Sequence, residues 1–153
     1  MPRTDTASRV VGTHAERVYR ALVDPEALAT WLPPQGMTAR FERFDARPGG
    51  SYRLVLTYDD AMDGRGKATA SSDIVEARFV SLEPGVRVVQ EVDFESVDSS
   101  FAGTMTMTWE LSSVSAGTLV AITAEDVPDG ISAHDHAAGM ASSLANLAEY
   151  LEA

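Results

Sequence analysis

The sequence predicts an α+β fold in which a curved, mostly antiparallel sheet of about six or seven strands wraps around one long C-terminal helix. Two segments, 52–58 and 103–111, alternate apolar and polar residues with the period of a strand. The last twenty-odd residues, 131–152, repeat apolar residues at helical spacing. Connections of hairpin length between the predicted strands favour antiparallel pairing.

The N-terminal part predicts a strand over residues 6–12 followed by two helices. Thr13 is expected to cap the first helix, and Glu16 three residues later would complete a capping box. That helix is expected to end at Asp24. The carboxylate of Asp24 then caps a second, short helix over residues 25–30, which has proline at its first position.

Six further strands are expected between residues 37 and 125. They cover residues 37–44, 52–58, 67–80, 86–94, 103–111 and 118–125. Turns rich in proline, glycine or serine separate several of them. The polar segment 59–66 is expected to be a hairpin connection, and its acidic residues lack the ligand spacing of an EF-hand.

The C-terminal helix has one apolar face. Its members recur at steps of four, four, three and four residues: His136, Met140, Leu144, Leu147 and Leu151. A helix of this length measures about 30 Å. Small residues flank the apolar face and allow a close approach to another surface. We therefore expect the helix to cover a twisted sheet, with room left between the two.

Length and composition indicate one globular domain over residues 1–153 with a single sizeable core. The chain has no cysteine, which excludes disulfides and thiolate metal sites. It shows no apolar run of signal-peptide or membrane-spanning length. We therefore expect a cytoplasmic protein without membrane insertion.

Charge is unevenly distributed along the chain. The formal net charge is −11, and residues 88–153 hold eleven acidic residues and no Lys or Arg. A region of this kind repels nucleic-acid phosphates and anionic membrane surfaces. Nucleic acid is therefore not an expected partner.

The residues that could carry chemistry are few. His134 and His136 are two positions apart, which places them on different faces of a helix and makes them poor joint metal ligands. The chain contains no sequence motif of a nucleophilic hydrolase, a phosphate loop, a dinucleotide fold or a zinc protease. No metal and no cofactor are predicted.

Asp73 stands out because it lies beside Ile74 within a strand region. It can face inward and partner Arg53 or Arg78 from another strand. A structural ion pair is favoured over a catalytic acid.

The candidate site is a set of apolar residues with a few polar tips. Its members are Trp31, Tyr52, Leu54, Leu56, Tyr58, Met107, Trp109, His136, Met140 and Leu144. Such a lining suits a hydrophobic or aromatic small molecule that is held by contact area and oriented by a few hydrogen bonds. The alternative is a solid core without a cavity.

Four segments carry a family resemblance: 15–34, 47–54, 79–94 and 134–151. With the order of elements, they resemble the START-like helix-grip (SRPBCC) superfamily, in particular the branch named after activators of the heat-shock chaperone ATPase. The resemblance implies the helix-grip fold. It implies no single function, because the superfamily includes lipid carriers, hormone receptors, polyketide cyclases and aromatases. Members often carry tryptophan where this chain has Met140, so we expect a wider or more adaptable pocket.

The leading hypothesis is binding or carriage of a hydrophobic small molecule between sheet and C-terminal helix, without catalysis. A second is a cyclase-, aromatase- or hydrolase-like enzyme using His136, Asp73 and either Tyr52 or Tyr58. A third is a protein-interaction module, such as a chaperone activator. A homodimer is left open.

Overall fold

A computed structural model of the chain describes residues 3–33, 36–58, 72–95, 100 and 102–152. The elements, in order, are β1 (Asp5–Val11), α1 (Ala15–Val23), α2 (Pro25–Trp31), β2 (Met37–Phe44), β3 (Ser51–Tyr58), β4 (Ser72–Glu83), β5 (Arg87–Glu95), β6 (Met105–Val114), β7 (Gly117–Glu125) and α3 (Ala133–Glu152). This is the predicted order of one strand, two helices, six strands and a long helix. The predicted loop 59–66 and the start of the strand predicted over 67–80 lie outside the described residues.

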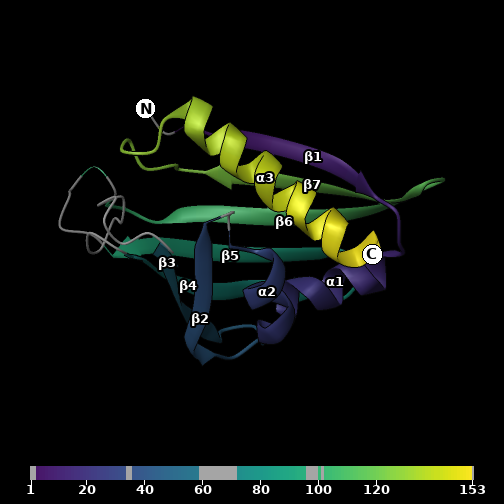
Figure 1. Cartoon of the computed structure of the whole chain (residues 1–153), viewed down its shortest axis with the longest axis horizontal. Coiled ribbons are helices and arrows are strands. Elements are labelled where there is room, and N and C mark those ends of the chain that lie inside the picture. Colours follow the sequence, from purple (N-terminus) through teal and green to yellow (C-terminus); the bar gives the residue numbers. More distant parts are fainter. Residues whose placement is uncertain (1–2, 34–35, 59–71, 96–99, 101, 153) are drawn as a thin grey trace.

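The seven strands form one antiparallel sheet in the order β1-β7-β6-β5-β4-β3-β2. Every neighbouring pair is antiparallel, as the short connections predicted. Figure 1 shows α3 running obliquely along one side of the sheet, with its last turn beside α1. The predicted α+β helix-grip fold is confirmed.

Strand alternation decides which face of the sheet α3 covers. In β6, Met105, Trp109 and Leu111 are buried, whereas Glu110 between two of them is exposed. The predicted apolar face of α3 is also buried for Met140, Leu144, Leu147 and Leu151, although His136 is only partly buried. Sheet and helix therefore bury their apolar faces against each other, which is the main stabilising contribution in a two-layer fold.

Helix α3 is fixed near its start to β1 and near its end to Gly12, the residue that follows β1. The His136 imidazole hydrogen-bonds the Asp5 carboxylate near the start of the helix. At its end, the Glu152 carboxylate accepts a hydrogen bond of 2.8 Å from the backbone N–H of Gly12. These contacts hold the helix along β1 and set the space beneath it.

The two predicted helix caps had different outcomes. Asp24 caps α2 as predicted, because its Oδ1 accepts a hydrogen bond of 3.0 Å from the N–H of Glu26. The prediction for Thr13 was wrong, since the residue at the N-cap of α1 is His14, which makes no side-chain cap. Thr13 lies one residue earlier, where its carbonyl accepts a hydrogen bond from the buried Thr118 hydroxyl.

Candidate functional site

A cavity of about 250 Å³ lies between the sheet and α3. Strands β3 to β7 form its floor, and α3 forms its roof. It is lined by Leu32, Tyr52, Leu54, Leu56, Val75, Gln90, Val92, Phe94, Met105, Met107, Trp109, Ile122, His136, Gly139, Met140 and Ser143. Most of these side chains are apolar, so the cavity suits an apolar molecule with few polar groups.

Seven of the ten residues predicted from the sequence line this cavity. They are Tyr52, Leu54, Leu56, Met107, Trp109, His136 and Met140. They come from three different elements, β3, β6 and α3. The same period that predicts the strands also selects the residues that face the helix.

The other three predicted residues lie elsewhere. Trp31 is buried behind the cavity, where its Nε1 donates a hydrogen bond of 2.9 Å to the carbonyl of Ala21. Its ring meets Trp109 edge to face with centroids 5.9 Å apart, and both border a small void of about 20 Å³. Leu144 is buried in the core. Tyr58 has its hydroxyl 3.5 Å from a carboxylate oxygen of Asp73.

Several lining residues were not among the predicted set. Val75 and Ile122 face the cavity because they are the register partners of the predicted residues Leu54 and Trp109. Val92 shares a side of β5 with Gln90, which is the register partner of the predicted Met107. Strand alternation could have found them. Gly139 carries no such signal. It lies at an exposed position of α3 yet lines the cavity, so it marks part of the mouth.

One polar group in the cavity is formed by Tyr52 and Gln90. Both are buried, and their side chains hydrogen-bond each other. Burial raises the pKa of Tyr52 to about 12, and the bond to Gln90 offsets only part of that rise. The phenol therefore stays protonated at neutral pH. A glutamine that bonds one hydroxyl keeps further donor and acceptor capacity.

A second polar group joins His136 to Asp5, which was not among the residues predicted for the site. His136 Nδ1 lies 2.7 Å from Asp5 Oδ2, and only 13% and 11% of these two side chains are exposed. Arg3 Nη2 also donates to Asp5 Oδ2, at 3.0 Å, and to the carbonyl of Ile131. Although burial pushes the pKa of the Asp5 carboxyl upward, the hydrogen bonds and charges of Arg3 and His136 hold it below its usual range.

The residues of the enzyme hypothesis do not all line one cavity. His136 and Tyr52 do, whereas Asp73 and Tyr58 are not among the lining residues. Asp73 is buried and near the Tyr58 hydroxyl.

The two arginines predicted as partners of Asp73 lie at outward positions of their strands. Arg53 pairs with Glu42 and Glu76. Arg78 pairs with Glu91 and Asp93. Asp73 is three residues from Glu76 on β4 and therefore faces the other side of the sheet, which explains why the prediction chose the wrong carboxylate for Arg53.

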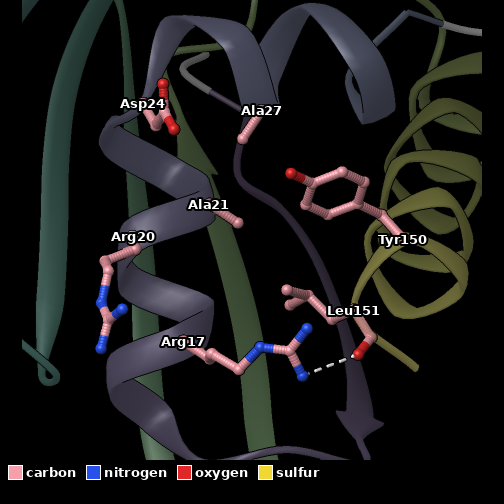
Figure 2. Close-up of a pocket in the computed structure, with 7 residues that line it drawn as sticks. All are labelled: Arg17, Arg20, Ala21, Asp24, Ala27, Tyr150 and Leu151. Atoms are coloured by element: carbon pink, nitrogen blue, oxygen red, sulfur yellow. Dashed lines mark hydrogen bonds between the residues drawn. The ribbon is translucent and has the colours of Figure 1, made fainter. Parts of the chain in front are cut away.

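A second pocket, of about 370 Å³, lies where α1 and α2 meet the end of α3 (Figure 2). Its lining residues are Arg17, Arg20, Ala21, Asp24, Ala27, Tyr150 and Leu151. Arg17 donates a hydrogen bond of 3.0 Å to the carbonyl of Leu151, and Asp24 caps α2. Figure 2 shows Arg20 on the side of α1 away from Tyr150. Since two of its charged groups already hold helix ends, this pocket is the weaker candidate despite its larger volume.

Within the described part of the chain, no group of three or more His, Asp and Glu side chains is placed to hold a metal ion. Likewise, no helix described in the structure is long and apolar enough to cross a membrane.

Family comparison agrees with the fold. The family described as "Activator of Hsp90 ATPase homolog 1-like protein" matches residues 12–152. The chain belongs to this family. No curated protein matches the sequence.

Solved structures of this family's fold are similar over nearly the whole chain. A crystal structure of a protein from Chromobacterium violaceum is 33% identical, with a TM-score of 0.86, and the match covers 98% of this chain and 97% of that one. A Rhodobacter sphaeroides protein (20% identity, TM-score 0.77, 99% and 98% covered) shares the fold. So does an AHSA1-like protein from Aeromonas hydrophila (18% identity, TM-score 0.75, 98% and 92% covered).

Proposed function

We propose that this family member binds a small hydrophobic or aromatic molecule in the cavity between the sheet and α3. The observation that carries the proposal is the cavity itself, with a volume of about 250 Å³ and a mainly apolar lining. Polar groups stand at only a few points on its wall, which is the usual composition of a small-molecule site.

The energetics of packing favour an occupied cavity. Protein cores are normally close-packed, and an apolar void lowers stability by roughly 24 cal/mol for each Å³ of its volume. On that scale, an empty cavity of about 250 Å³ would lower the stability of the folded protein by several kcal/mol. A bound apolar molecule recovers this contribution through contact with Met107, Met140 and their neighbours, and flexible methionines adapt to its shape.

The size of the cavity limits the ligand. Sites for drug-sized ligands have volumes of about 300–1,000 Å³, and this cavity lies just below that range. The expected ligand is accordingly a compact molecule with one or two rings, or a short acyl chain. The two polar groups, Tyr52–Gln90 and His136–Asp5, would orient it.

The protein-interaction hypothesis has less support. Large exposed apolar side chains among the described residues are Val10, Val80, Val86, Val114 and Tyr150, and they belong to different elements or turns. A docking surface would gather such side chains into one patch.

Native mass spectrometry of protein isolated from its own host tests the proposal. We expect a mass increment from a bound apolar compound, which Leu56→Trp abolishes by filling the cavity. Thr57→Trp is the matched control, because Thr57 is the next residue of β3 and is exposed on the other side. A wild-type protein that carries no compound, and that also binds none of a panel of small aromatic compounds in calorimetry, would refute the proposal.

A further inference from the structure

Hydrogen bonds join Arg3, Asp5 and His136 in a row that leads from the start of β1 to the cavity wall. We call this row of three side chains the relay. Arg3 binds Asp5 through Nε, at 3.1 and 3.2 Å, and through Nη2, at 3.0 Å. Asp5 in turn meets Nδ1 of His136 at 2.7 Å. Arg3 itself is held in place, because its Nη2 donates to the Ile131 carbonyl and its own carbonyl accepts a hydrogen bond from the backbone N–H of Val127.

The relay fixes the role of each imidazole nitrogen. An ionised carboxylate can only accept hydrogen bonds, so Nδ1 of His136 carries the proton that points to Asp5. In the neutral imidazole, Nε2 is then an acceptor. His136 lines the cavity, and Nε2 has no hydrogen-bond partner among the described residues.

The other polar group stands across the cavity floor. Asp5, Ala124, Met107 and Gln90 are register partners on four adjacent strands. Strands lie about 4.8 Å apart, which separates the backbones of Asp5 and Gln90 by roughly 14 Å along the sheet. A compact ring lying over Met107 can therefore present a polar substituent to His136 without reaching Gln90.

We propose that Asp5, held by Arg3, positions His136 so that Nε2 accepts a hydrogen bond from a ligand hydroxyl. The cavity then selects small cyclic alcohols or phenols over the matching ketones and hydrocarbons. This inference rests on the proposed function, because it assigns the polar group of the molecule that the cavity binds. In it, His136 contacts the ligand and Asp5 is a positioning residue.

Three bicyclic probes of nearly equal shape test the inference: 2-indanol, 2-indanone and indane. Calorimetry is performed at about pH 8, because alkaline conditions favour a neutral imidazole, whose second nitrogen can accept a hydrogen bond. For the wild type, 2-indanol is expected to bind roughly five- to tenfold more tightly than 2-indanone, because only the alcohol donates a hydrogen bond. The ketone oxygen can only accept hydrogen bonds, so it would face the Nε2 acceptor of His136 without forming a hydrogen bond.

Two variants separate positioning from a merely structural role. Asp5→Ala and His136→Phe should each bring the alcohol-to-ketone affinity ratio close to one while indane still binds. Arg9→Gln, at an exposed position of β1, is the control and should keep the wild-type ratio. A structural role for Asp5 would instead lower the affinities for all three probes by a similar factor.

The outcomes are distinct. If the wild type binds all three probes equally, or if both variants keep the alcohol preference, the inference is overturned and the proposed function stands. If none of the probes binds to the wild type, the inference is overturned, and native mass spectrometry with the wider panel of compounds decides the proposed function separately.

Discussion

His136 Nδ1 and Asp5 Oδ2 lie 2.7 Å apart although their residues are separated by 131 positions in the chain. The contact joins the first turn of α3 to the start of β1. Together with the Gly12–Glu152 hydrogen bond, it holds the helix along the edge strand. The same contact orients the only histidine that lines the cavity described above.

The Asp5 carboxyl should make the protein sensitive to acid. Its pKa is lower in the folded protein than in the unfolded chain, so the unfolded state binds protons more readily. This contribution is fully present above the unfolded pKa of about 4. It is lost as pH falls through the lower folded pKa.

Urea unfolding between neutral and acidic pH measures this contribution. Asp5→Asn should make the free energy of unfolding fall less steeply with acid. A reduced slope is expected rather than a flat one, since the pKa values of Glu76 and Asp93 are lowered as well. Glu125→Gln, at an exposed position, should leave the slope unchanged. An Asp5→Asn slope equal to the wild type would contradict the prediction.

Gly139 offers a way to narrow the cavity mouth. A Cβ built at this position meets no atom within 4 Å, so a side chain fits there. Gly139→Ala should stabilise α3 by up to about 1 kcal/mol, because alanine loses less backbone entropy than glycine in a helix. Thermal unfolding measures this change, and a lower melting temperature would show that the position needs glycine.

A larger side chain at the same position should hinder ligand entry. Gly139→Leu is expected to lower the affinity for 2-indanol, because Gly139 lines the cavity at an exposed position. Ala138→Leu is the matched control, since Ala138 is exposed and does not line the cavity. Equal losses in the two variants, measured by calorimetry, would mean that ligands enter elsewhere.

The first residue of β7, Gly117, must be glycine for a different reason. Gly117 has a φ of +140°, and a Cβ there would lie 2.1 Å from the carbonyl oxygen of Val11. Gly117→Ala should therefore cost more than the roughly 1–3 kcal/mol of backbone strain alone. Gly85→Ala is the comparison, because Gly85 also has a positive φ but open space around it. Chemical denaturation should show the larger loss for Gly117→Ala, and the reverse order would refute the close contact.

Trp109 can report on the cavity directly. The chain has two tryptophans. In the variant Trp31→Phe, the only remaining tryptophan is Trp109, which lies in the cavity wall. That variant should lose about 1–3 kcal/mol, because the Ala21 carbonyl loses its hydrogen bond from Trp31. The fluorescence of the remaining Trp109 should change as 2-indanol is added. No change under conditions where calorimetry detects binding would place the ligand away from Trp109.

Strand period and helix period predicted much of the fold and seven of the proposed site residues. Met107 and Trp109 could be assigned to one face because every second residue of a strand shares a face. Asp5 could not be found in this way. Its importance comes from a partner on the last helix, and no local pattern in the sequence links two positions so far apart.

The wrong predictions have the same origin. Thr13 fits a capping box by spacing, yet its carbonyl is held by Thr118 from β7, and the helix begins after His14. Asp73 and the arginines were paired by charge, although strand alternation places them on opposite sides of the sheet. Local propensity gives way to tertiary contacts in both cases.

A crystal structure of the protein soaked with a ring-brominated 2-indanol shows directly whether the cavity between the sheet and α3 binds a small aromatic alcohol. We expect one bromine anomalous peak inside the cavity, between Met107 of the sheet and Met140 of α3, with the hydroxyl directed toward His136. A bromine peak only in the pocket of Figure 2, between α1 and the end of α3, would refute the proposed function, as would an empty cavity at a ligand concentration that saturates binding in solution.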